Sequence, residues 1–150
     1  MKKFILGLFL ILGAVSFAAP KFVDMTKVKN AGYVIKNERE DILTMATSDD
    51  DSAIIISFST INMSSKEISD LLKSNALRDS GNFIATLDNN RAYINEFEAQ
   101  GFYSYMIVPK KEKVKNQHTY ATYVSSKKLS KNDLSKITNA ILDEAESYIK

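Results

Sequence analysis

The sequence predicts an α+β domain. Its mainly antiparallel sheet should have about six or seven strands and two packed helices, in the order β-β-β-α-β-β-β-β-α after an N-terminal leader. Short runs rich in β-branched and aromatic residues recur between turn-forming residues over most of the chain. In two stretches, 64–77 and 130–149, the apolar residues are instead spaced by three and four, as on one face of a helix.

The first residues have the layout of a Sec-type signal peptide. Lys2 and Lys3 precede an uncharged apolar run, and Ser16 and Ala18 supply the small residues at the −3 and −1 positions of a cleavage site. We expect cleavage after Ala18, with residues 1–18 as signal peptide, residues 19–150 as a single domain, and a periplasmic or secreted product. The alternative is an uncleaved anchor, but the apolar run is shorter than the roughly 20 residues of a spanning helix. No cysteine follows the run, so a lipid anchor is not expected.

An irregular lead-in over residues 19–31 should precede three strands. The third strand contains three consecutive isoleucines and then Phe58, which is typical of a buried central strand. An acidic turn at 48–51 separates it from the strand before. The three strands are predicted at 33–35, 42–47 and 53–60.

A helix, a meander and a second helix should complete the domain. Ser64 and Glu67 form a capping-box pattern at the start of the helix over 64–77. Tight turns then join three strands, and Pro109 ends the third because proline lacks a ladder donor. Ser130 caps the last helix. These strands are predicted at 82–87, 92–98 and 102–108, with another at 118–125 and the helix over 130–149.

This arrangement resembles the PsbP/Mog1/DcrB-like superfamily. The shared features are the early strand pair, the capped helix, the meander, the strand at 118–125 and the closing helix. The resemblance covers most of residues 19–150 and is one of element order. It implies a non-enzymatic binding or assembly accessory, as in photosystems, nuclear transport and bacterial envelopes. No site motif of the superfamily is recognised, so no functional residue is carried over.

Composition excludes several classes of function. The chain has no cysteine, which rules out thiol catalysis and cysteine-ligated metals. Its 20 basic and 18 acidic side chains balance once Lys2 and Lys3 leave with the signal, so general nucleic-acid binding lacks electrostatic support. No two glycines after residue 18 are close enough for a phosphate-binding loop, and we expect no cofactor. No transmembrane segment is expected after cleavage.

Charge is nevertheless segregated along the chain. Residues 38–51 have a net charge of −5, and residues 110–131, with seven lysines and one glutamate, have a net charge of +6. Such runs are most often solvated loops. The functional interpretation is a basic lobe for an anionic envelope surface or an acidic protein partner. The candidate binding residues are Lys110, Lys111, Lys113 and Lys115, together with Tyr103 and Tyr105, whose strand face would either bind a partner or pack in the core.

Three groups of residues have the chemistry for a site, and a plain structural role competes with each. His118, the only histidine, would have to serve any Ser–His–acid triad, although it should lie on the surface at the start of a strand. Asp49, Asp50 and Asp51 are calcium candidates in an ordinary acidic turn. Glu96 and Glu98 should share a strand face at a spacing that glycosidases also use.

The sequence therefore predicts a small exported accessory protein that binds a partner or supports assembly in the bacterial cell envelope, without catalysis. The alternatives are an extracytoplasmic hydrolase that uses His118, and a small-ligand or calcium carrier that uses Asp49, Asp50 and Asp51.

Overall fold

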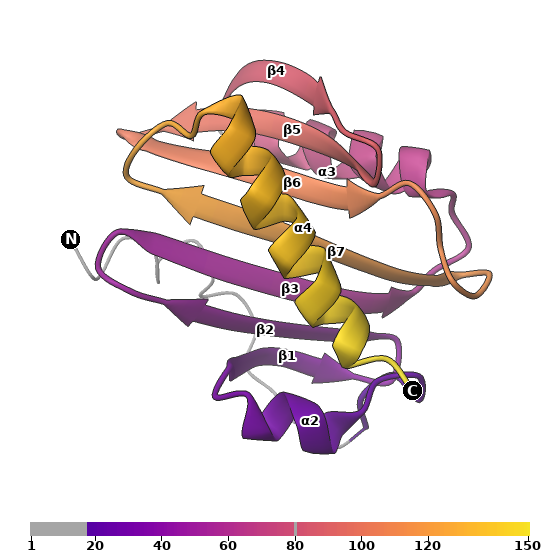
Figure 1. Ribbon diagram of the computed structural model, residues 1–150. Helices are drawn as coiled ribbons and strands as arrows, with labels where there is room; N and C mark the ends of the chain where they lie inside the picture. Colours follow the sequence, from indigo (N-terminus) through magenta and orange to yellow (C-terminus); the bar gives the residue numbers. More distant parts are fainter. Residues whose placement is uncertain (1–17, 80) are drawn as a thin grey trace.

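The strands form one antiparallel sheet in the order β1-β2-β3-β7-β6-β5-β4 (Figure 1). The computed structural model describes residues 18–79 and 81–150, so the predicted leader, apart from Ala18, lies outside the described residues. The predicted α+β class and the order β-β-β-α-β-β-β-β-α are confirmed. The strands are β1 (Val34–Arg39), β2 (Ile42–Ser48), β3 (Ser52–Thr60), β4 (Asn82–Asp88), β5 (Ala92–Ala99), β6 (Phe102–Pro109) and β7 (Gln117–Ser125).

The described helices are α2 (Met25–Asn30), α3 (Ser65–Arg78) and α4 (Lys131–Ser147). Both predicted caps are present: Ser64 and Glu67 form the capping box of α3, and the Ser130 hydroxyl accepts from the backbone N–H of Asp133 at the start of α4. Within residues 18–79 and 81–150, none of the helices has the length and apolar character needed to span a bilayer.

Helix α2 corrects the prediction of an irregular lead-in. The Asp24 carboxylate accepts from the backbone N–H groups of Thr26 and Lys27 at 3.1 and 3.2 Å and so starts the helix. Val28 is fully buried in the main core. A helix of six residues offers only one such apolar anchor, which is too little periodicity to recognise in the sequence.

The chain crosses the sheet once and returns by tight turns. After the central strand β3, helix α3 carries the chain to the far edge at β4, and the meander β4-β5-β6-β7 then brings it back beside β3. The β5–β6 turn has positive φ at Gln100 and Gly101, 54° and 83°, as a two-residue hairpin turn requires. At the β4–β5 turn, Asn89 Oδ1 accepts from the N–H groups of Arg91 and Ala92 at 2.8 and 2.6 Å.

The main core lies between the sheet and α4. Alternate strand side chains face α4, and Phe58 lies in its centre, with edge-to-face contacts to Phe22 and Tyr148. Burying each side chain of this size stabilises the fold by about 1.5–3 kcal/mol. The fully buried members include Val28, Leu43, Met45, Ile56, Phe58, Tyr105 and Ile107.

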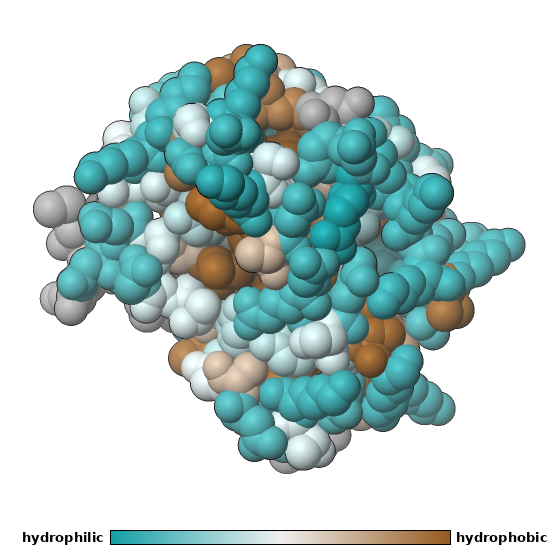
Figure 2. Space-filling model, viewed as in Figure 1, coloured by the Kyte–Doolittle hydropathy of each residue, from teal (hydrophilic) through white to brown (hydrophobic). Residues whose placement is uncertain are grey.

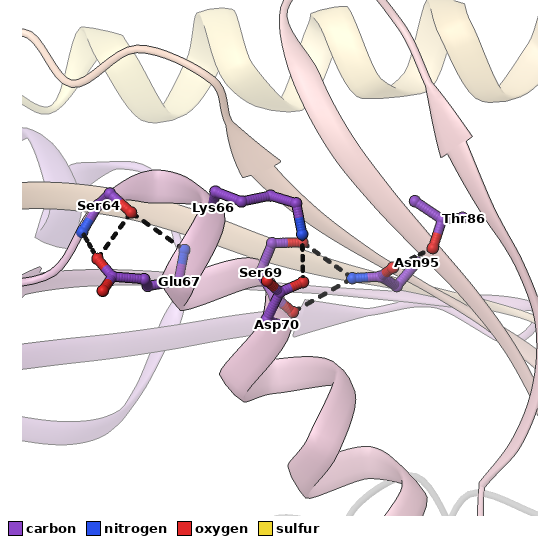
Figure 3. A network of polar contacts seen from close by, with 7 residues as sticks. All are labelled: Ser64, Lys66, Glu67, Ser69, Asp70, Thr86 and Asn95. Carbon is purple, nitrogen blue, oxygen red and sulfur yellow. Dashed lines mark hydrogen bonds and ion pairs between the residues drawn. The ribbon is translucent and has the colours of Figure 1, made fainter.

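Helix α3 covers the opposite face of the sheet, over β5 and β6 (Figure 1). A buried polar network fixes its position (Figure 3). Asn95 Nδ2 donates to the hydroxyl and the carbonyl oxygen of Ser69 at 3.0 and 3.3 Å, and Asn95 Oδ1 accepts from the Thr86 hydroxyl at 2.9 Å. Because Asn95 is only 2% exposed, losing a partner would leave a buried polar group unsatisfied, and the network therefore specifies how α3 lies on the sheet.

Candidate functional site

A small cavity lies at the end of the sheet where β6 passes into β7. We call this the loop end, because the β6–β7 loop, residues 110–116, covers it. The cavity has a volume of about 40 Å³, which suits water-sized groups, whereas pockets for organic ligands are several hundred Å³. Its lining comes from the lead-in, the start of α3, the lysine-rich loop, the start of β7 and the end of α4, and includes Phe22, Ser65, Lys111, Glu112, His118 and Glu146.

His118 and Glu112 are the central pair of this site. His118 Nε2 lies 3.1 Å from Glu112 Oε2, and the His118 side chain is 3% exposed while that of Glu112 is 31% exposed. His118 Nε2 has no hydrogen-bond partner among the described groups, so the Glu112 carboxyl lies beside the ring without a hydrogen bond to it. The prediction of a surface histidine is wrong, because the lysine-rich loop folds back over the end of β7 and buries the ring.

Glu112 also holds the loop in shape. Its Oε2 accepts from the backbone N–H of Asn116 at 3.0 Å, and Asn116 has the positive φ of 66° that turns the chain into β7. The Asn116 carbonyl in turn accepts from the N–H of Ile61 at 3.0 Å, and the N–H of Gln117 donates to the Val114 carbonyl at 3.0 Å. The Glu112 carboxylate therefore braces the loop from within, and the Ile61 N–H ties its base to the segment that follows β3.

The four lysines of this loop have different surroundings. Lys113 Nζ lies 3.2 Å from Glu146 at the end of α4, and Lys110 Nζ lies 5.5 Å from the centre of the Tyr93 ring. Lys111 and Lys115 are exposed, as is Val114 between two lysines, at 52%. Hydrophilic side chains project from this end of the molecule (Figure 2). The loop thus presents positive charge around one exposed apolar residue.

Two serines lie near His118, but neither forms a triad with it. Ser59 is the direct cross-strand partner of His118 in the β3–β7 ladder, where side chains of opposed residues are about 5 Å apart. The Ser59 hydroxyl is buried and lies near the Tyr120 hydroxyl, whereas His118 Nε2 faces Glu112. Ser65 lines the cavity as the first residue of α3. A serine, a histidine and an acid are thus neighbours without the hydrogen-bonded relay of a triad.

The aspartate run forms a turn. Asp49 Oδ1 accepts from the N–H groups of Asp51 and Ser52 at 2.9 and 2.7 Å. Donation by the Asp51 N–H and then by Ser52 holds the pKa of the Asp49 carboxyl below its ordinary value. The Asp51 carbonyl accepts from Ser126. In the described part of the chain, no three His, Asp or Glu side chains are grouped as they would be to hold a metal ion.

The predicted tyrosines and glutamates differ in how deeply they are buried. Tyr105 is fully buried, and its hydroxyl accepts from the Leu129 N–H at 2.8 Å. Burial raises the pKa of Tyr105. The hydrogen bond from Leu129 lowers this pKa, and the nearby Glu96 raises it further. Tyr103 is partly exposed. Glu96 is 3% exposed, whereas Glu98 Oε1 accepts from the Gly101 N–H at 3.0 Å in the exposed β5–β6 turn.

The basic stretch 110–131 divides between the two ends of the sheet. Lys110, Lys111, Lys113 and Lys115 lie at the loop end, before β7, while Lys127, Lys128 and Lys131 lie after β7, at the end where α4 begins. We call the second end the α4-start end. There, Lys128 Nζ lies 3.7 Å from the buried Glu96 carboxylate. The lysines of residues 110–131 thus form two separate groups and not the one basic lobe expected from the sequence.

Glu112, the one acid among the four lysines, is not among the candidate residues that the sequence indicates. Its isolation in a basic run was the available signal, but its role depends on how the loop folds over His118. Comparison of the chain with protein-family models, curated proteins and solved structures finds no match.

Proposed function

We propose that the chain is a small exported accessory protein of the bacterial cell envelope, which docks without catalysis on an anionic surface through the lysine-rich loop. The observation that carries the proposal is the braced loop: four lysines and the exposed Val114 occupy residues 110–115, Glu112 bonds to the Asn116 N–H within the loop, and the Ile61 N–H donates to the Asn116 carbonyl at its base. A loop held in one shape loses less conformational entropy on binding than a flexible one.

An anionic lipid surface suits this loop better than an acidic protein does. Clustered lysines contribute about 1 kcal/mol each next to an anionic membrane, and an apolar residue among them can enter the headgroup region. Protein interfaces instead tend to exclude lysine from their centres. The signal-peptide pattern and the resemblance to PsbP-like accessories support the location and the non-enzymatic role.

Vesicle co-sedimentation tests the proposal directly. The processed protein should bind phosphatidylglycerol vesicles and not phosphatidylcholine vesicles, and added salt should weaken the binding because screening lengths shorten. Reversal of Lys110, Lys111, Lys113 and Lys115 to glutamate should abolish it. If wild type ignores both vesicles but captures an envelope protein in a loop-dependent way, the surface is wrong and the partner is an acidic protein. If the reversal weakens neither vesicle binding nor capture of an envelope protein, the loop is not the docking surface.

A hydrolase is the second candidate, favoured by the burial of His118 beside Glu112 and Ser59. A rotation of the His118 ring toward Ser59 would create the nucleophile–base contact that is now missing. A fluorophosphonate probe should then label wild type and not Ser59→Ala. The control is Ser57→Ala, since Ser57 is a buried serine of the same strand face that hydrogen-bonds Thr44 instead. Absence of labelling in wild type would remove this candidate.

A further inference from the structure

A second, larger hollow lies at the loop end, beside the lysine-rich loop. It is open to solvent and has a volume of about 630 Å³, which is within the range of pockets that hold small organic groups. The lead-in, the β1–β2 turn, the end of β3 and the start of β7 surround it, and these strand ends are neighbours in the sheet (Figure 1). Of the described residues that line it, Lys21 and Arg39 are cationic, and Glu40 and Asp41 are anionic.

Backbone hydrogen bonds fix the walls of this hollow. The Thr60 N–H donates to the Asp41 carbonyl at 2.9 Å, which joins the β1–β2 turn to the end of β3. The Lys150 N–H donates to the Phe22 carbonyl at 2.9 Å and holds the lead-in. The Phe22 ring is 9% exposed and packs edge-to-face on Phe58 in the main core. The hollow is therefore preformed, and a ligand would not have to order its backbone.

The charges that line the hollow are of both signs. Arg39 Nε lies 3.4 Å from Asp41 Oδ1, so these two side chains pair across the β1–β2 turn. Lys21 and Glu40 are exposed on the same lining. A ligand with one charge of each sign can meet a counter-charge at both of its ends, whereas a simple anion or cation would also meet a like charge. The lining therefore favours a zwitterion.

We infer that the hollow holds the headgroup of an aminophospholipid, in which a phosphate monoanion is joined by a short carbon chain to a primary ammonium group. This inference rests on the proposed docking of the loop on a membrane. The hollow and the small cavity under the loop share Phe22 and Gln117 in their linings, so a bilayer that meets the loop also meets the hollow. Lys21 contacts the phosphate, and Glu40 accepts from the ammonium group.

This arrangement discriminates between two headgroups of equal charge. The ammonium group of phosphatidylethanolamine has N–H donors, whereas that of phosphatidylcholine is fully methylated and has none. The Glu40 carboxylate can only accept hydrogen bonds, so it forms a charge-assisted contact with the first headgroup and not with the second. The lysines of the loop respond to the net negative charge of the surface and do not distinguish these two lipids.

Vesicles of equal phosphatidylglycerol content separate the hollow from the loop. When phosphatidylethanolamine replaces phosphatidylcholine as the second lipid, the processed protein should bind about tenfold more tightly, the effect of one charge-assisted contact. Lys21→Gln/Glu40→Gln keeps the net charge and should bind both kinds of vesicle equally. The matched control is Lys131→Gln/Asp79→Asn, which removes one exposed charge of each sign at the α4-start end and should keep the wild-type ratio. Circular dichroism checks that each variant folds.

Soluble glycerophosphoethanolamine tests the hollow without a bilayer. A chemical-shift titration by NMR should show saturable binding of this headgroup to wild type, and no binding of glycerophosphocholine. Absence of binding to wild type, or unchanged binding to Lys21→Gln/Glu40→Gln, would overturn the inference even if the loop docks as proposed. Binding of the soluble headgroup without preference between the two kinds of vesicle would overturn the lipid as its source. Binding of the headgroup by a protein that ignores phosphatidylglycerol would support the hollow and contradict the proposed function of the loop.

Discussion

Lysines occur at both ends of the sheet, but their neighbours differ. At the loop end, Lys111 and Lys115 are exposed on a loop that Glu112 braces from within. At the α4-start end, Lys128 lies next to the buried Glu96 carboxylate. The nearby Leu129 N–H donates to the buried Tyr105 hydroxyl. Similar positive charge therefore has different surroundings at the two ends. At the α4-start end Lys128 lies against a buried carboxyl group of the fold, and at the loop end Lys111 and Lys115 face outward.

The largest stability effect should come from the buried ring at the loop end. His118→Ala removes a side chain that is 3% exposed, and the cavity left behind should lower the free energy of unfolding by about 2–4 kcal/mol. Urea denaturation measures it. Glu112→Gln is the matched control, since it removes the charge but keeps an oxygen for the Asn116 N–H, and should cost less than about 1 kcal/mol. Equal losses in both variants would mean that charge, and not packing, holds this end.

Lys128→Ala should have the next largest effect, at the α4-start end. It leaves the buried Glu96 carboxylate without the cation 3.7 Å away, at a cost of about 1–2 kcal/mol in the free energy of unfolding. Lys127→Ala, an exposed neighbour, should change stability by less than about 0.5 kcal/mol. A similar stability of the two variants would contradict the structural role assigned to Lys128.

Tyr148→Phe should have a smaller effect, where α4 ends at the loop end. The hydroxyls of Tyr33 and Tyr148 both donate to Glu144 Oε1, at 2.9 and 2.8 Å. Because Tyr33 still satisfies that oxygen, we expect a loss of about 1 kcal/mol by thermal unfolding. A Tyr33→Phe/Tyr148→Phe double variant should lose more than the sum of the single variants, because Glu144 then has neither donor.

The same pair gives an alkaline pH dependence. Burial, and then the contact with Glu144, raise the pKa of both Tyr33 and Tyr148. A pKa raised by folding contributes stability that is complete below the unfolded value, about 10, and is lost as the pH rises through the folded value. Wild type should therefore lose stability above about pH 10 more steeply than the double variant. Parallel pH profiles would contradict this assignment.

Asp49→Asn should have the smallest effect, and its small loss of stability should be present at neutral pH and disappear in acid. Because hydrogen bonds from Asp51 and Ser52 lower the pKa of this exposed carboxyl, its contribution is present above the unfolded pKa, about 4, and is lost as the pH falls through the folded value. The variant should thus show a shallower loss of stability in acid and keep the neutral-pH behaviour of the loop end. If the free energy of unfolding falls equally steeply in acid for the variant and for wild type, the Asp49 turn does not contribute to the pH dependence of stability.

The fold could be predicted from the sequence because its signals are local. The capping box at Ser64 and Glu67, the Gln100–Gly101 turn and the isoleucine run of β3 each specify an element within a few residues. Helix α2 could not be predicted in this way, since its main anchor is the contact of Val28 with residues distant in sequence.

The candidate site depends on contacts across the whole chain. The lysines of residues 110–131 were visible in the sequence. Their division into two groups follows from the length of β7, which separates residues 110–116 from residues 127–131. The burial of His118 requires the loop, the start of α3 and the end of α4 to meet at one end of the sheet. Periodicity within β7 gives the face on which His118 lies but not what covers that face.

Binding of two charge-matched variants to phosphatidylglycerol vesicles tests the central claim most directly. Lys111→Glu/Lys115→Glu and Lys127→Glu/Lys131→Glu change the net charge equally, and all four lysines are exposed. The first variant should bind about 100-fold more weakly than wild type, at about 1 kcal/mol for each lysine lost and a further repulsion from each glutamate. The second should stay within about threefold of wild type, because its charges lie at the far end of β7. Equal weakening of both variants would show that net charge, and not the braced loop, governs binding.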